Sequence, residues 1–510
     1  MPAPVRLLTL LTLIAALEAL PQPRVRETID VRIIEVDVIV TDAAGQRVHG
    51  LTAVDFEAFE DRKRQEITNF TEYRAHTRDE ILDAASPLPA REPHSLLVLV
   101  DSLPREGLVR RNTLESVQAL IARTVAGGDR VGLVFWEPVL ERATTIVELT
   151  ENRDDVARAI ESWVRGGSTP AAPDDSEIVK AFFERGARAT AVKGGGIVVA
   201  GEMAASDRFA ATADLIRLRR KTAAMRQIVA SLGTGAGKKT VLYVSNGFSL
   251  PSNPQARQSA IAMLEDLAKA ANAAGVTFYA AHPATPETTD ISDLSRRADA
   301  LSRLTEPTGG RLELGLSSPS TVGRQIEEDR NTYYSLAYRA RSDDRDRERR
   351  IRVKTKNPAY RVRVRDSIVE KSNETMARDA LLARLFTGNE RNDVEFAIRE
   401  DPPRESSRGR WLLPLVITIA AAQLRFEPEG RDQVALLKIL IVAANGVAEV
   451  TNIHEDTLRV VAGKDSPAGL VKYSVTILGD RRGSQLSIGV FDVRTGLVGV
   501  RTLDNRNRLP

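Results

Sequence analysis

The amino-acid sequence predicts an α/β protein whose core is a doubly wound parallel sheet, flanked by a β module on one side and a β-sandwich on the other. Apolar runs that fit buried strands alternate with segments that have helical periodicity, and this alternation is typical of a parallel sheet covered by helices on both faces. The strand segments are residues 94–101, 129–136, 139–149, 239–245 and 276–281. The helical segments are residues 108–126, 152–163, 254–274 and 291–304.

The segments outside this core predict the rest of the domain organisation. Residues 31–40 alternate between polar and apolar side chains, which indicates a half-buried strand in an N-terminal β module over residues 27–75. The α/β domain then covers residues 94–367 and carries a helical insertion at residues 176–232. Residues 376–510 begin with one helix and continue as strands separated by turn signals, which predicts a C-terminal β-sandwich domain; within it, residues 411–424 predict a pair of strands.

Composition excludes several function classes. The 72 basic residues nearly balance the 69 acidic ones, and a net charge of +3 gives no reason to expect nucleic acid as a partner. The absence of cysteine rules out disulfides, thiolate metal sites and cysteine nucleophiles. The five histidines lie far apart, so a zinc site built from histidines is not expected.

No enzyme motif stands out. The sequence contains no Gly-x-Ser-x-Gly, and no pair of carboxylates is singled out by spacing. The glycine-rich segment 233–240 resembles a phosphate-binding loop, but it has Leu232 where the first glycine is needed, and it precedes its strand instead of following one. We therefore expect a protein that is not an enzyme, with a hydrolase that has an unidentified carboxylate site as a minor alternative.

The first residues have the pattern of an export signal. Arg6 precedes an apolar run over residues 7–16, and small residues follow before Pro21. This run is too short to span a bilayer, so residues 1–20 predict a signal peptide, with an uncleaved anchor as the alternative. We expect a secreted or periplasmic protein with no membrane span in the mature chain.

Polar residues at the ends of the predicted strands form the candidate ligand site. Asp101 ends the first strand, Asn246 and Gly247 follow residues 241–245, and Ser168 and Thr169 follow the helix at residues 152–163. The carboxyl ends of parallel strands are where open α/β sheets place their ligands. Oxygen-bearing side chains that converge there are the ligands that a hard divalent cation such as Mg²⁺ prefers.

At these positions the sequence resembles the von Willebrand factor A domain, and more closely the acidobacterial VWFA-related domain family. The matching segments, within residues 29–367, are 38–45, 51–57, 98–102, 129–134, 166–170, 241–247 and 333–338. The resemblance implies an A-type fold that binds a protein or a surface ligand. It also implies a metal-dependent adhesion site made from an Asp-x-Ser-x-Ser loop, a distal threonine and a distal aspartate.

Only part of that adhesion site is present in this sequence. Asp101 and Thr169 match the family pattern, but Leu103 and Arg105 replace the two serines and Asn246 replaces the distal aspartate. We expect a degenerate site in which Arg105 or a loop interaction neutralises Asp101, with weak Mg²⁺ binding as the alternative. Ser102, Ser168 and Gly247 complete the predicted ligand-binding edge. Two functions compete: binding without metal at this edge, or a periplasmic assembly scaffold in which the A domain is a structural spacer.

Overall fold

The structure is a computed structural model. It describes residues 33–74, 93–101, 103, 107–124, 128–137, 142–164, 199–233, 237–248, 250–251, 253–283, 291–314, 319–339, 345–387, 393–406, 410–444, 450–462, 469–480 and 485–504. The predicted signal peptide at residues 1–20 lies outside these ranges. Within them, no helix combines the length and the apolar character that crossing a membrane requires.

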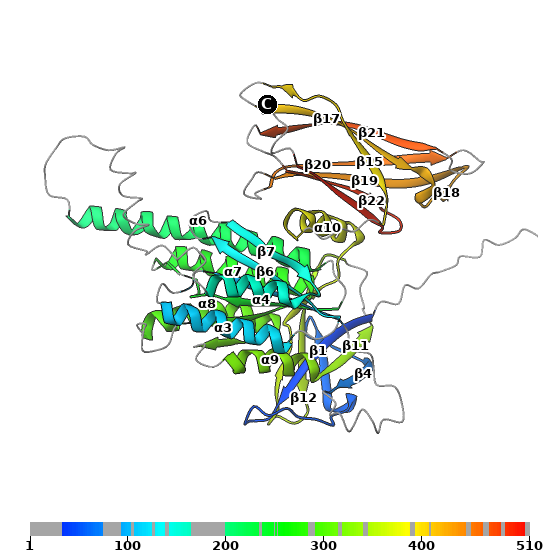
Figure 1. Ribbon diagram of the computed structural model, residues 1–510. Coiled ribbons are helices and arrows are strands. Elements are labelled where there is room, and N and C mark those ends of the chain that lie inside the picture. Colours follow the sequence, from blue (N-terminus) through cyan, green and yellow to red (C-terminus); the bar gives the residue numbers. More distant parts are fainter. Residues whose placement is uncertain are drawn as a thin grey trace, which may run out of the picture.

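A six-stranded sheet forms the centre of the molecule, in the order β10-β9-β8-β5-β6-β7 (Figure 1). Its strands are β5 (His94–Val100), β6 (Arg130–Glu137), β7 (Arg142–Thr150), β8 (Lys238–Val244), β9 (Val276–His282) and β10 (Leu312–Leu314). The first strand, β5, lies in the middle and pairs in parallel with both β6 and β8. The chain therefore builds the sheet outward in one direction and then in the other, which confirms the predicted doubly wound α/β core.

The sequence predicted a parallel sheet, but one edge of the observed sheet is antiparallel. β7 pairs antiparallel with β6, with Phe135 opposite Thr144 and Trp136 opposite Ala143. Only residues 138–141 separate the two strands. A parallel neighbour needs a crossover of about a dozen residues or more, so a connection of this length forces the chain to turn back on itself.

Helices cover both faces of the sheet. The helices of one face are α6 (Val199–Gly233), α7 (Pro254–Ala274) and α8 (Ile291–Thr305), and those of the other are α3 (Gly107–Thr124), α4 (Arg153–Val164) and α9 (Pro319–Asn331). Successive side chains of β5 point to opposite faces: Leu97 and Leu99 pack under the first set, and Leu96 and Val98 under the second. The all-apolar β5 is thus explained by burial on two sides.

The N-terminal strands do not form the separate β module that was expected over residues 27–75. They build two four-stranded sheets together with residues 333–369, in the orders β13-β1-β11-β4 and β14-β12-β2-β3. These strands are β1 (Ile33–Thr41), β2 (Phe56–Glu60), β3 (Lys63–Gln65), β4 (Ile67–Tyr73), β11 (Tyr333–Arg339), β12 (Glu348–Thr355), β13 (Arg361–Arg363) and β14 (Ser367–Val369). Val36, Val38 and Val40, which alternate along β1, are buried in a core shared with side chains of β2, β11 and β12. A segment of about 45 residues is too short to bury such a core alone.

The C-terminal region consists of helix α10 and two sheets that share one apolar core. The elements are α10 (Asn373–Thr387), β15 (Phe396–Glu400), β16 (Arg404–Glu405), β17 (Arg410–Ala420), β18 (Glu427–Glu429), β19 (Asp432–Ala444), β20 (Val450–Ala462), β21 (Leu470–Asp480), β22 (Gln485–Asp492) and β23 (Val498–Asp504). The expected strand pair over residues 411–424 is one strand, β17, followed by a 3-10 turn at Ala421–Gln423. In Figure 1, α10 lies between the central domain and these sheets, and it packs against both α6 and β22.

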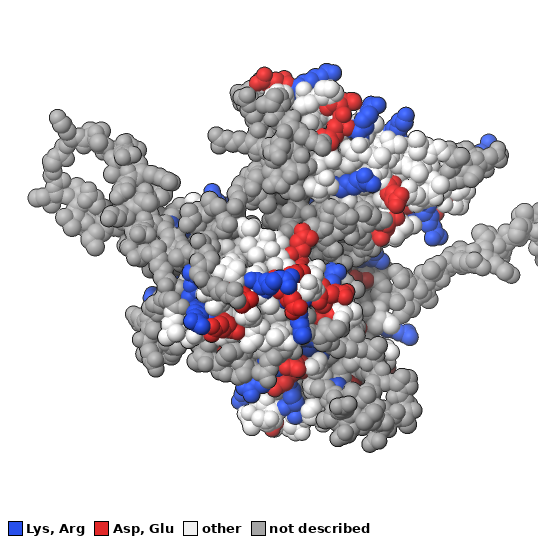
Figure 2. Space-filling view, viewed as in Figure 1, with Lys and Arg blue, Asp and Glu red and all other residues white. Residues whose placement is uncertain are grey.

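Charged side chains of both signs are interspersed over the surface in view (Figure 2). This pattern agrees with the near balance of acidic and basic residues in the sequence. On this face, the charge distribution of the described residues does not single out a binding surface.

Candidate ligand-binding edge of the central sheet

The candidate site lies where the winding of the sheet reverses, between β5 and β8. These neighbouring strands are followed by connections that run in opposite directions, a geometry that opens a crevice beyond their carboxyl ends. Asp101 directly follows β5, and its backbone N–H donates to the carbonyl of Val244 at 2.8 Å. Ser245, Asn246 and Gly247 directly follow β8. The structure therefore brings the predicted residues Asp101, Asn246 and Gly247 to one edge.

Asp101 is fully buried, and its carboxylate is held by three donors. Oδ2 accepts hydrogen bonds from the hydroxyl of Tyr243 at 2.5 Å and from that of Ser245 at 3.0 Å. It also forms an ion pair with the ammonium of Lys221, with Nζ at 2.7 Å. A carboxylate without partners would be very unfavourable at this depth, so these three groups explain how it can be ionised there.

Lys221 comes from α6, which overlaps the predicted insertion, and sequence reasoning missed it. Its side chain is 18% exposed, and Nζ lies 5.6 Å from the ring centroid of Trp136 and 5.7 Å from that of Phe248. The two aromatic rings and the carboxylate together stabilise the ammonium. A signal existed in the sequence: Lys221 lies three residues after the buried Leu218 and four before the buried Met225, on the apolar stripe of the helix.

Tyr243 adds a neutral donor to the site. Burial, and then the negative charge of Asp101, raise the pKa of the Tyr243 phenol well above its ordinary value. The hydroxyl therefore stays protonated at physiological pH and keeps donating to the carboxylate. The site contains one negative charge, one positive charge and two hydroxyl donors.

This donor set does not fit a divalent cation. The Lys221 ammonium lies against the only carboxylate of the predicted ligand set, and a cation there would meet its positive charge. Leu103, which replaces the first family serine, is 3% exposed and packs in the core with Val100 and Leu114. No cluster of three or more histidine, aspartate or glutamate residues that could hold a metal occurs in the described ranges.

The remaining predicted residues divide into two groups. Ser102, Ser168 and Thr169, together with Arg105, lie outside the described residues, so their part in the site stays a prediction. Asn246 is described, and its Oδ1 atom is buried without a hydrogen-bond partner among the described residues. An acceptor left in this state is unfavourable unless a donor from a ligand or water reaches it.

Gly247 and Arg297 define the side of the edge next to Asn246. Gly247 has φ +87°, and a Cβ atom added there would lie 2.9 Å from Cβ of Arg297 on α8. The guanidinium of Arg297 donates to the carbonyl of Asn246 at 3.3 Å. The glycine therefore permits both the left-handed backbone and the close approach of α8.

The sheet topology and the buried Asp101 together define the kind of domain that holds this site. It is an α/β domain with a doubly wound, mostly parallel sheet and a buried carboxylate directly after its first strand, and its assignment to the von Willebrand factor A-like kind stays a prediction from the sequence. No protein-family model and no curated protein matches the chain.

Several solved structures are similar to parts of this chain. The PilB minor pilin from Streptococcus sanguinis matches at 10% identity and a TM-score of 0.27, over 48% of this chain and 63% of that one. The pilus adhesin SpaC from Lactobacillus rhamnosus GG matches at 8% identity and a TM-score of 0.28, over 88% of this chain and 60% of that one. The vWF domain of the type V pili tip protein Mfa5 from Porphyromonas gingivalis matches at 12% identity and a TM-score of 0.23, over 47% and 95%.

This chain spans about six tenths of the length of the pilin and of the adhesin. At these TM-scores the similarities carry no argument. The fold therefore rests on the strand order and pairing, and the function has to be argued from the residues of the site.

Proposed function

We propose that this chain is an exported, non-enzymatic protein that binds another protein or a surface ligand at the carboxyl edge of its von Willebrand factor A-like domain, without a metal. The observation that carries the proposal is the ion pair between Lys221 and Asp101. In the family that the sequence resembles, this carboxylate would hold the cation that captures the partner. Here the charge that the cation would supply comes from the protein itself.

The proposal keeps the finer expectations from the sequence. Residues 1–20 act as a signal peptide, the mature protein is secreted or periplasmic, and the chain belongs with the acidobacterial VWFA-related proteins that its sequence resembles. The contact face comprises Asn246, whose buried oxygen can accept a hydrogen bond, and the first turn of α7, which follows it in the sequence. That turn is held by Asn253, whose side chain accepts from the backbone N–H groups of Gln255 and Ala256.

Site-specific photo-crosslinking tests this function. A benzoylphenylalanine is placed at the exposed Gln255, at the amino end of α7, and the full chain is produced in its own cells with a chelator present. The matched control is the exposed Asp266, near the other end of the same helix. We expect cross-linked protein at Gln255 and not at Asp266. Cross-links at Gln255 that appear only when Mg²⁺ is added would contradict the metal-free mechanism.

One observation supports the scaffold alternative. Helix α10 packs against α6 of the central domain and shares an apolar cluster with β19, β22 and β23 of the C-terminal sheets, so it lies between these two parts and contacts both. A third cross-linker at the exposed Lys472 of β21 tests this alternative. Cross-links at Lys472 alone would favour a scaffold in which the β-sandwich docks and the A-like domain is a spacer.

A further inference from the structure

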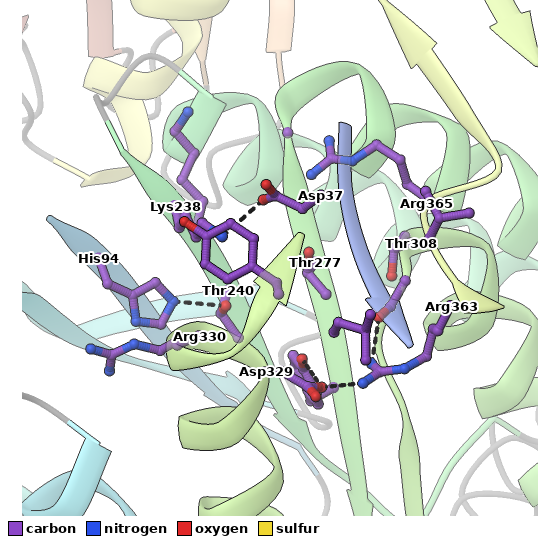
Figure 3. Close-up of a pocket in the computed structure, with 17 residues that line it drawn as sticks. Asp37, His94, Lys238, Thr240, Thr277, Thr308, Asp329, Arg330, Arg363 and Arg365 are labelled. Carbon is purple, nitrogen blue, oxygen red and sulfur yellow. Dashed lines mark hydrogen bonds and ion pairs between the residues drawn. The ribbon is translucent and has the colours of Figure 1, made fainter. Parts of the chain in front are cut away.

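A second polar cavity lies at the opposite, amino edge of the central sheet. It has a volume of about 80 Å³, enough for several water molecules or one tetrahedral oxyanion. Strand β1 and the segment after β13 form one wall, and the first residues of β8 and β9 form the other (Figure 3). No residue of the Asp101 site lines it.

Positive charge exceeds negative charge in this cavity. Its lining includes five cationic side chains, from Lys238, Lys239, Arg330, Arg363 and Arg365, and two acidic ones, from Asp37 and Asp329. Asp129 pairs with Arg330 and Arg47 pairs with Asp329 from outside the lining, and these two opposite charges offset each other. The carboxyl end of α7 lies beside the cavity at Gly275, and its partial negative charge of about one half is small against this surplus.

The two acids of the cavity are already used by other cations. Asp329 is bound by Arg47 and by Arg363, and it accepts from the hydroxyl of Tyr279 at 2.6 Å. Asp37 forms an ion pair with Lys238 at 2.9 Å. Neither carboxylate is therefore free to neutralise a further guanidinium.

Arg365 is that further guanidinium. Its side chain forms no hydrogen bond or ion pair with any described residue, and Figure 3 shows it extending toward Asp37. Burial lowers the pKa of Arg365, with the charge of Asp37 opposing this in part. Arg365 is only part-buried, so an anion or water that enters the cavity can reach its N–H groups.

Arg363 presents a second donor of the same kind. Nη1 and Nη2 donate to the carbonyl of Gly309 and to Asp329, while Nε is buried without a partner. In Figure 3 the two side chains diverge: Arg363 runs to Asp329, whereas Arg365 extends toward Asp37. The alternation of Arg and Val over residues 361–365, visible in the sequence, brings both arginines into the lining of this cavity.

We propose that this cavity binds a tetrahedral oxyanion of the phosphate class, with the guanidinium of Arg365 as its main ligand. Arginine presents several N–H donors in a planar fork that matches the oxygens of phosphate. The hydroxyl of Thr277, which also lines the cavity, adds a donor from the opposite wall. The site is separate from the proposed ligand-binding edge, so it adds a ligand to the protein and does not depend on that function.

Calorimetric titration of the full chain with inorganic phosphate, at constant ionic strength, tests the proposal. We expect the substitution Arg365→Gln to weaken phosphate binding by about tenfold or more, because it removes the charge-assisted bonds. The matched control is Arg361→Gln, on the same extended segment but exposed, and it should change the affinity less than about twofold. Unfolding curves without phosphate establish that both variants are folded, and Thr277→Val serves as a second variant with nearly unchanged volume.

The outcomes separate the sources of the anion. Binding of inorganic phosphate that is lost in Arg365→Gln supports the proposal. Tighter binding of glucose 6-phosphate through the same arginine also supports it, with the anion belonging to a larger molecule. An absence of phosphate binding in the unsubstituted chain overturns it, and so does equal binding by the unsubstituted chain and by both the Arg365→Gln and Thr277→Val variants.

Discussion

The ammonium of Lys221 lies 2.7 Å from Oδ2 of Asp101, although 120 residues separate the two in the sequence. This ion pair joins helix α6 to the end of the central strand β5, at the point where the winding of the sheet reverses. It neutralises a carboxylate that is fully buried.

Removing the cation of this pair should destabilise the central domain. We expect Lys221→Met to lower the free energy of unfolding by about 3 kcal/mol, because it leaves the buried Asp101 without a counter-charge. Denaturant unfolding measures the change. The control is Arg219→Met, which removes an exposed cation from the same helix and should change the free energy by less than about 0.5 kcal/mol. Equal effects of the two substitutions would mean that the pair adds nothing to stability.

Divalent cations should not stabilise the protein. Because Lys221 already neutralises Asp101, we expect about 5 mM Mg²⁺ to shift the melting temperature of the central domain by less than about 1 °C. We expect an equally small shift for Asp101→Asn. Calorimetry measures the melting temperatures of both proteins, with samples in EDTA as the reference. A rise in the melting temperature of about 5 °C that Asp101→Asn abolishes would show that a metal displaces the lysine. This result would contradict binding without a metal.

Asp329 should make stability depend on pH in the acid range. Burial raises the pKa of this carboxyl, but the charges of Arg363 and Arg47 outweigh burial and hold the pKa below its ordinary value. A lowered pKa means that the ionised group stabilises the fold above the unfolded pKa of about 3.9, and that this contribution is lost as the pH falls through the lower, folded pKa.

We therefore expect Asp329→Asn to lower the free energy of unfolding at pH 7 by about 3 kcal/mol and to flatten its decline below about pH 4. Denaturant unfolding from pH 2.5 to pH 7 is the measurement, with pH values chosen around that ordinary pKa of about 4. The control is Asp432→Asn, at an exposed residue on β19. This substitution should leave the pH dependence of the free energy of unfolding unchanged. A steeper acid decline in Asp329→Asn would show that the sign of the shift is wrong.

Gly247 should be needed for two separable reasons. Replacing it by alanine introduces a left-handed residue and a contact at 2.9 Å with Cβ of Arg297, so we expect a loss of about 2–3 kcal/mol. Gly430 has φ +66° and no heavy atom within 4 Å of an added Cβ, so Gly430→Ala should cost only about 1 kcal/mol. The difference in unfolding free energy measures the steric contact, and equal losses would mean that α8 moves aside.

Much of the central domain could be predicted from local patterns. β5 is buried along its whole length, and α7 begins at Pro254 and ends at Ala274, as its periodicity predicts. Asn152 caps α4 by accepting from the backbone N–H of Asp154 at 3.2 Å. These features depend on neighbouring residues, and burial or periodicity within a short window is enough to reveal them.

The partners of these segments could not be predicted in the same way. The antiparallel direction of β7 follows from a short connection, but the pairing of β1 with β11 joins Val36 to Leu336 across 300 residues. The period-two pattern of β1 shows that one face is buried, and it contains no information about which strand buries it. The expected N-terminal module was therefore incomplete as a unit.

The sequence by itself determined the doubly wound core and the position of Asp101 at a strand end, because both follow from apolar runs and from the order of strands and helices. Only the tertiary structure decided what neutralises Asp101. The ammonium comes from Lys221 on a helix whose position over the sheet is set by apolar packing of its other residues. The grouping of Arg363 and Arg365 with Asp37 and Asp329 has the same origin. Charge interactions depend on distances in space, and those distances exist only once the apolar surfaces have been packed.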